Sequence, residues 1–165
     1  MNSSYLPVLL ALALFASPAL AEDKGGIRLN VVKKTLDRAD GKPSYMREVD
    51  RSMALKATIK NLTSKEMPEA TLDCVILIQR WGLSETGATE RYKKTHKLPV
   101  LKSAQEVELL VGDYHIGGHM HGRSDEHVDQ ILGWKITVDH AGKKTEFVSK
   151  ANFDALDKRA KDARQ

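Results

Sequence analysis

The fold of this chain is decided by Val107–Val148, which has the sequence VELLVGDYHIGGHMHGRSDEHVDQILGWKITVDHAGKKTEFV. Apolar and polar residues alternate in Glu106–Val111 and again in Ile131–Asp139. Residues two apart share one face of a strand, so both segments are predicted strands with one buried face. His140–Lys144 is a glycine-containing turn, and Thr145–Val148 returns after it. These last three segments are therefore a predicted β-hairpin.

Similar alternation precedes this stretch. Ala70–Trp81 is apolar on both faces, which indicates the central strand of a sheet. Leu36–Arg47 is a predicted polar loop around the turn signal Asp40–Pro43, and Glu85–Ala88 is a second turn. Short strands separated by turns, without helical crossovers, predict an all-β fold, an immunoglobulin-like antiparallel β-sandwich. The predicted strands of this part are Ile27–Val31, Ser52–Lys60, Ala70–Trp81 and Thr89–Leu98.

The two ends of the chain differ from the middle. Leu6–Leu20 is almost wholly apolar, is short for a membrane span, and ends in small residues of the kind a signal peptidase recognises. Met1–Tyr5 carries no Lys or Arg, so a retained N-terminal anchor is the alternative. Helical spacing of apolar residues predicts a short helix at the other end. We therefore predict a signal peptide over 1–21, the sandwich over 22–150, and a C-terminal helix over 151–165 that packs on or trails the sandwich.

Composition limits the partners. The net charge is +4 and the pI is about 9.1. An exported domain with this balance has a mild preference for anions such as anionic glycans, lipid headgroups or acidic proteins. Nucleic acid is not expected, because there is no dense Lys/Arg stripe with aromatic residues between. Cys74 is the only cysteine; we expect a buried thiol, with an intermolecular disulfide as the alternative. No membrane span is expected once the signal is removed.

Histidines gather in the segment between the predicted strands. His119 and His121 are two residues apart, and His115 and His127 also lie at odd positions. Imidazoles on one face of a strand suit zinc or copper, so these four are the candidate metal ligands. The acceptors that could orient the imidazoles are Asp113, Asp125 and Asp129.

Glycines favour a different interpretation of the same segment. Gly117, Gly118 and Gly122 are expected to interrupt the strand and leave the histidines on a loose loop. On this interpretation no cofactor is expected, and the loop is a recognition surface or a pH-sensitive element.

Other motifs give no catalytic constellation. Ser103, Ser124 and Ser149 stand outside the Gly-x-Ser-x-Gly pattern, and no phosphate-binding glycine loop is present. Trp81 and Trp134 suit either sugar stacking or core packing. Tyr114 is a candidate corner tyrosine whose hydroxyl would bond to backbone. We expect a protein that is not an enzyme.

The strand pattern resembles a known kind of protein. The segments Met53–Asn61, Cys74–Gly82, Val107–Tyr114 and Gly133–Val138 resemble strands of small exported immunoglobulin-like proteins of Gram-negative bacteria. Some proteins of this kind occur with type IV pilus-like machinery and have been likened to archaeal pilin sandwiches. The resemblance implies a non-enzymatic surface or periplasmic role with self-association. No long apolar helix follows the leader, so it implies an accessory protein rather than a filament subunit.

Three functional hypotheses follow. The first is an exported binding or assembly module of the cell envelope, pilus-associated or adhesive, that is secreted, periplasmic or on the outer surface. Its partner would be a protein, a second copy of the chain, or an anionic glycan. The second is a metal-binding module or metalloenzyme that uses His115–His127. The third is a carbohydrate-binding domain.

Overall fold

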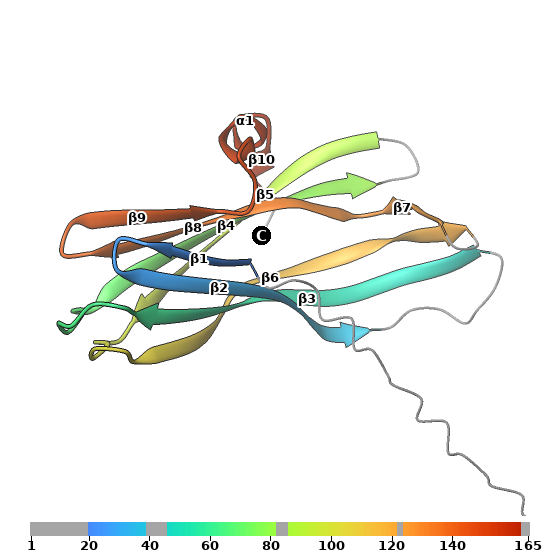
Figure 1. Ribbon diagram of the computed structural model, residues 1–165. Helices are drawn as coiled ribbons and strands as arrows, with labels where there is room; N and C mark the ends of the chain where they lie inside the picture. The colour runs from blue at the N-terminus through green and yellow to red at the C-terminus, as the bar shows by residue number, and fades with distance from the viewer. Residues whose placement is uncertain (1–19, 39–45, 82–85, 122–123, 163–165) are drawn as a thin grey trace, which may run out of the picture.

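The chain is described by a computed structural model over residues 20–38, 46–81, 86–121 and 124–162. In these residues the strands form two stacked sheets, and one short helix lies above the second (Figure 1). The first sheet has the order β1-β2-β3-β6-β7, and the second has the order β10-β5-β4-β8-β9. The elements are β1 (Leu20–Lys24), β2 (Ile27–Arg38), β3 (Met46–Asn61), β4 (Ala70–Trp81), β5 (Thr86–Leu98), β6 (Glu106–His121), β7 (Ser124–Val128), β8 (Gln130–His140), β9 (Lys143–Val148), α1 (Phe153–Asp157) and β10 (Lys161–Asp162).

Alternate residues of the two sheets form one core. In β3 the alternate residues Leu55, Ala57 and Ile59 are fully buried. Facing residues of β4, including Leu72 and Ile76, are buried in the same cluster. On the opposite face β3 carries polar side chains such as Lys56 and Lys60, as expected for a half-buried strand, whereas β4 carries apolar Val75 and Leu77 there as well. The all-β sandwich predicted from the alternation is confirmed.

The topology is that of an immunoglobulin-like sandwich. β2, β3 and β6 are neighbours in one sheet, and β5, β4, β8 and β9 are neighbours in the other. This order corresponds to strands A-B-E facing C′-C-F-G. The predicted central position of β4 is confirmed, since it pairs with β5 on one side and with β8 on the other. Apart from β10, every pairing is antiparallel.

The predicted hairpin over 131–148 is also confirmed. His140 pairs with Lys143 at the end of the β8–β9 ladder. The two residues between them, Ala141 and Gly142, have φ angles of 51° and 77°. Two consecutive positive φ angles give a tight turn that matches the twist of the strands.

Two predicted loops were wrong in part. β2 continues to Arg38 and β3 begins at Met46, so the described ends of the predicted loop Leu36–Arg47 are strand, while residues 39–45, which include the turn signal Asp40–Pro43, lie outside the described residues. β5 begins at Thr86, within the predicted second turn. The sequence is largely polar at the ends of β2 and β5, so these segments give no alternation of apolar and polar residues to recognise.

The histidine segment is strand rather than loop. β6 runs through Gly117 and Gly118 to His121, and β7 pairs with it. Gly118 has a φ of 143°, and a Cβ there would lie 2.2 Å from the backbone oxygen of His127. The glycine therefore allows β7 to approach β6 closely instead of ending the strand.

The C-terminal helix is shorter than predicted. α1 spans Phe153–Asp157 only, and Asn152 precedes it without a side-chain capping hydrogen bond. Phe153 is buried against Gly133 of β8, where a Cβ would lie 3.3 Å from the ring. β10 then pairs with β5. Among the described residues, no helix has the length and apolar character needed to cross a membrane.

Candidate functional site

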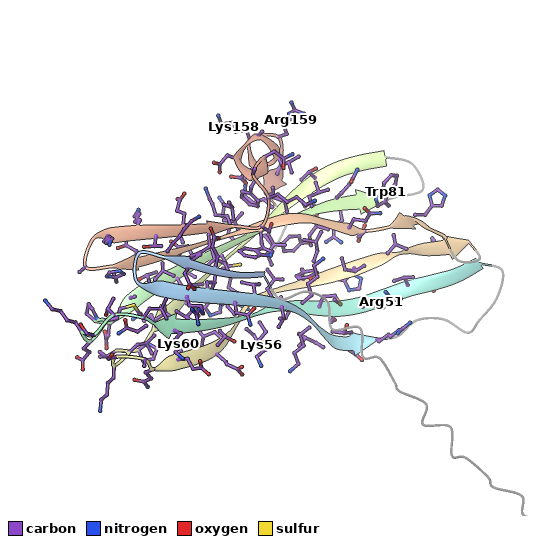
Figure 2. All side chains as sticks on the ribbon, viewed as in Figure 1. Arg51, Lys56, Lys60, Trp81, Lys158 and Arg159 are labelled. Carbon is purple, nitrogen blue, oxygen red and sulfur yellow. The ribbon has the colours of Figure 1, made fainter. Side chains whose placement is uncertain are left out.

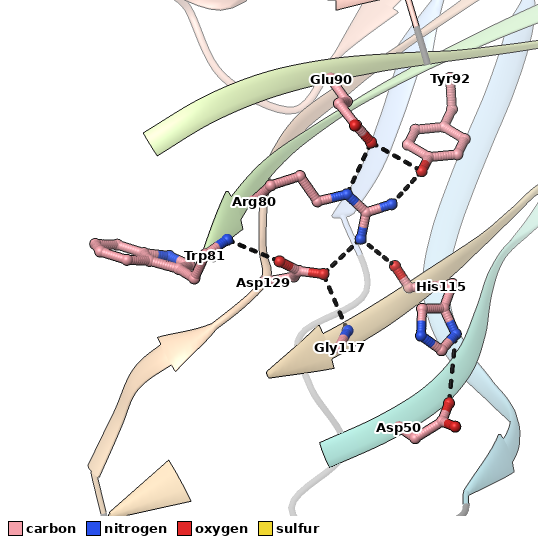
Figure 3. Close-up of polar contacts among 8 residues, drawn as sticks. All are labelled: Asp50, Arg80, Trp81, Glu90, Tyr92, His115, Gly117 and Asp129. Atoms are coloured by element: carbon pink, nitrogen blue, oxygen red, sulfur yellow. Dashed lines mark hydrogen bonds and ion pairs between the residues drawn. The ribbon is translucent and has the colours of Figure 1, made fainter. Parts of the chain in front are cut away.

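A polar cluster joins the two sheets where β4 ends (Figure 3). The Nε of Arg80 donates to Glu90 Oε2 at 2.8 Å, and another of its nitrogens donates to the hydroxyl of Tyr92. Its third nitrogen donates to the carbonyl of His115 at 2.9 Å and to the carboxylate of Asp129. Glu90 and Tyr92 belong to the second sheet and His115 to the first. Arg80 therefore links the sheets directly.

Asp129 is the buried anion of this cluster. It lies between β7 and β8, where the chain passes from one sheet to the other, and only 8% of the residue is exposed. Its carboxylate also accepts the backbone N–H of Trp81 at 2.9 Å and that of Gly117 at 3.0 Å. Burial alone lowers the pKa of Arg80, but hydrogen bonds to Glu90 and Asp129 outweigh it and raise that pKa above its ordinary value. The cluster is a hydrogen-bonded ionic link between the two sheets.

The outer face of the first sheet carries the predicted metal ligands. His119 pairs directly with His127 of β7 on one side and with Glu48 of β3 on the other. His115 lies on the same face of β6, and its Nδ1 is 3.4 Å from the carboxylate of Asp50. His121 pairs with Ser124 through the backbone, but its side chain lies outside the described residues.

The structure brings together part of the predicted metal set. His119 and His127 are opposite each other, whereas His115 lies further along β6 beside Asp50. Among the side chains that the structure describes, no group of three or more His, Cys, Asp or Glu is placed to hold a metal ion. With His121 outside that set, zinc or copper binding by these four histidines stays a prediction. Asp129, a candidate orienting acceptor, instead binds Arg80.

Three other predicted features have clear outcomes. Trp134 is buried in the core, whereas Trp81 is partly exposed at the end of β4 (Figure 2). Cys74 is buried in the central strand, where burial raises the pKa of the thiol to about 12, so an intermolecular disulfide is the wrong interpretation. Tyr114 was wrongly expected to be a corner tyrosine, because its buried hydroxyl has no hydrogen-bond partner among the described residues.

The edge of the second sheet is long and basic. β5 pairs with β4 over its length, but β10 covers it only at Glu90 and Arg91. The part of the edge that follows, Tyr92–Leu98, has exposed lysines at 93, 94 and 97. It ends at a shallow hollow of about 550 Å³ between Glu69–Thr71 and Lys97–Pro99.

Further exposed cations lie at the end of α1, above the second sheet. Lys158 and Arg159 follow α1 and point away from the sandwich (Figure 2). Carboxylates in the same region are engaged: Asp157 binds Arg91, and Asp113 binds Lys94. The hydrogen bond from Lys94 lowers the pKa of Asp113. We call Tyr92–Leu98 of β5 the basic edge.

No family model matches this sequence, and no curated protein matches it. The solved structures with a distant likeness to this chain include two that can be described. One is Northeast Structural Genomics Consortium target SoR45, with 13% identity, a TM-score of 0.42, and coverage of 76% of this chain and 83% of that one. The other is a protein from Akkermansia muciniphila, with 9% identity, a TM-score of 0.40, and coverage of 87% and 84%. The fold assignment therefore rests on the topology of the chain itself.

Sequence reasoning missed both the Arg80 cluster and the basic edge. Arg80 is a single charged residue near the end of an apolar strand, and this isolation is the one local signal of a buried ionic role. Its partners lie between 10 and 49 residues away in the chain. The lysines of β5 are visible in the sequence, but only the sheet order shows that they line an edge.

Proposed function

We propose that this protein is an exported, non-enzymatic binding module of the cell envelope, and that it holds an acidic, extended polypeptide segment along the basic edge of β5. The observation that carries the proposal is the pairing of β5. Its residues 92–98 are hydrogen-bonded to β4 on one side and have no strand on the other within the described residues.

An uncovered strand edge suits a polypeptide partner. Every second residue of such an edge presents its backbone N–H and C=O outward, and an added strand can pair with them. Tyr92–Leu98 is about as long as an average strand. The hollow beside Lys97 gives room for a side chain at one end of the added segment.

The charges of the basic edge determine which kind of polypeptide segment it can bind. Lys93 and Lys97 lie on the outer face of β5, since they pair with Val75 and Thr71, while Lys94 lies on the other face. An added strand would therefore meet the ammonium groups of Lys93 and Lys97 on its outer face, which favours acidic side chains there, while Lys94 on the other face already binds Asp113. A second copy of β5 would place lysine against lysine, so self-pairing through this edge is disfavoured.

Lysines on an edge strand have a second, ordinary use. Natural sheets carry them to prevent unwanted pairing with other strands. The two roles differ in what they predict for an acidic partner: a protective edge rejects every strand, whereas a binding edge accepts an acidic strand and rejects a basic one.

A peptide titration separates these roles. The probe is a synthetic peptide in which Glu alternates with Val, and its control has Lys in place of Glu. We expect saturable binding of the acidic peptide only, weakened by added salt. The K93E/K97E variant is expected to lose about thirtyfold in affinity, because each of the two lost ion pairs at a partly desolvated edge contributes roughly 1 kcal/mol.

The matched control is K56E/K60E. Lys56 and Lys60 lie on the outer face of β3, in the other sheet (Figure 2). This variant has the same net charge as K93E/K97E and is expected to bind the acidic peptide like the parent. Equal loss in both variants would indicate attraction by net charge alone and would contradict the proposal. So would tighter binding of a linear anionic polysaccharide, since a glycan gains nothing from the backbone of β5.

A second candidate, metal binding, is favoured by one observation. His119 and His127 are direct cross-strand partners, with Glu48 next in register. Directly opposed side chains on a sheet have Cβ atoms roughly 5 Å apart, which lets two imidazoles reach one ion. Titration with Zn²⁺ and Cu²⁺ tests this candidate, with H119A/H127A as the test variant and H140A, at the far hairpin, as the control. Equal metal affinity in all three proteins would exclude the site.

A further inference from the structure

β6 forms a second strand edge, on the same side of the sandwich as the basic edge. It pairs with β3 along its length, but β7 joins its other side only from Gly118 onward. After Val128 the chain crosses to the second sheet and continues as β8, so β7 does not extend along the rest of β6. Over Glu106–Ile116, β6 therefore has no strand on its outer side within the described residues.

The two edges lie level with each other and run in opposite directions. The ammonium group of Lys94 binds the carboxylate of Asp113, which ties β5 to β6 across the two sheets. β5 ends and β6 begins at the end of the sandwich where residues 61–69 join β3 to β4. A strand placed beside β5 with the direction of β6 would therefore pair with it in the antiparallel sense.

The edge of β6 is acidic where that of β5 is basic. Glu106, Glu108 and Leu110 are exposed on its outer face, since the residues between them pack against the core. Glu108 binds Lys56, but its side chain is 57% exposed and can accept a second cation. Lys97 and Glu106 have no ion pair within the described residues. Leu110 is 46% exposed, and native sheets avoid apolar side chains on a long open edge unless another strand covers them.

We infer that the acidic strand held by β5 is β6 of a second copy of this chain, so that the protein forms a two-fold dimer through these two edges. The inference rests on the proposed function, because it names the partner of the basic edge. A two-fold axis parallel to the strands places β6 of each copy beside β5 of the other, so the same contact forms twice. Both sheets then continue from one copy into the other through antiparallel pairs.

Charge complementarity selects this pairing over the other two combinations of edges. β5 against β5 sets lysine against lysine, and β6 against β6 sets glutamate against glutamate, which is unfavourable for directly opposed residues. In the mixed contact, Lys93 and Lys97 of one copy lie on the same outer face as Glu106 and Glu108 of the other. Two short strand pairs bury little area, so we expect a weak dimer that forms as the concentration rises.

Sedimentation equilibrium of the purified protein measures this association. We expect the apparent mass to approach twice that of one chain at high concentration. K93E/K97E and E106K/E108K reverse the charge of opposite sides of the contact, and each should raise the dimer dissociation constant by about a hundredfold or more. An equimolar mixture of these variants should restore the dimer, because an acidic edge then faces a basic one in both contacts. Recovery in the mixture also shows that each variant is folded.

The control mixture combines K93E/K97E with E22K/E146K. Glu22 and Glu146 lie on β1 and β9, the edge strands at the other side of the sandwich. E22K/E146K has the same net charge as E106K/E108K but keeps an acidic β6, so only one of its two contacts with K93E/K97E is complementary. With an N-terminal fluorescent label on K93E/K97E, we expect association about tenfold weaker or more than in the first mixture. Equal association in the two mixtures would show attraction by net charge alone and would overturn the inference.

The acidic peptide separates this inference from the proposed function. E106K/E108K keeps the basic edge, so it should bind the peptide at least as tightly as the parent, and the peptide should dissociate the parent dimer. If the parent stays monomeric at every concentration while the peptide still binds β5, the dimer is excluded and the proposed function stands. If neither a second copy nor the peptide binds, both are excluded.

Discussion

Replacing Arg80 with methionine removes the charged link between the sheets while keeping a side chain of similar length. The carboxylate of Asp129, whose side chain is 6% exposed, would then lose its cationic partner but keep the backbone donors of Trp81 and Gly117. Glu90, whose side chain is 35% exposed, would be left able to reach water.

The expected loss of folding stability in R80M depends on how each of these two carboxylates can be compensated once Arg80 is gone. Removing one partner of a buried ion pair costs about 3–5 kcal/mol, because the other charge stays buried without compensation. The two backbone donors that Asp129 retains place R80M near the lower limit, at about 3 kcal/mol. An exposed pair gives the comparison: Lys94 and Asp113 have 48% and 62% of their side chains exposed, and K94M should cost less than about 1 kcal/mol.

Urea unfolding at pH 7 measures both values. We expect R80M to lower the midpoint strongly with little change in the slope, since the exposed area on unfolding is similar. The R80M/D129N double variant should recover part of the loss, because the buried charge is gone. A loss below about 1 kcal/mol in R80M, or a loss equal to that of K94M, would refute the role assigned to the cluster.

Other predictions concern single buried groups. G118A should destabilise the fold by more than about 2 kcal/mol, because the new Cβ would meet the backbone of His127; G142A, whose Cβ position has nothing within 4 Å, is the control and should cost about 1 kcal/mol from its positive φ alone. Equal losses would contradict the close approach of β7. Cys74, with its pKa raised to about 12, should react with a thiol reagent at pH 8 only at the rate of unfolding; prompt reaction in native buffer would contradict its burial. Y114F should raise the free energy of unfolding by about 1 kcal/mol, and a loss of that size would show that the hydroxyl has a partner.

The sequence correctly predicted the strands that bury one face, because such strands show an alternation of apolar and polar residues. Alternation over Ser52–Lys60 and Ile131–Asp139 is a direct consequence of one buried face, and both became core strands. Gly117 and Gly118 misled the prediction, because a glycine weakens a strand in general but here permits close approach by another. That approach depends on β7, which carries no apolar alternation of its own.

The candidate sites depend on residues far apart in the chain. Arg80 and Asp129 are 49 residues apart, and nothing near either one indicates the other. The C-terminal segment shows the same limit: helical spacing predicted one helix over 151–165, yet Lys161 pairs with Glu90 and the helix ends at Asp157. The spacing of apolar residues along a segment predicts which of its faces is buried. The order of strands within a sheet decides which strands lie at an edge, and this order depends on residues far apart in the chain.

The most direct test of the proposed function is to follow the backbone amides of the protein by NMR while the acidic peptide is added. Strand addition predicts that amides of Tyr92–Leu98 shift and become protected from hydrogen exchange, while those of β3 around Lys56 and Lys60 do not change. Shifts spread evenly over both lysine-bearing surfaces, or confined to side chains with no added protection at β5, would contradict the account.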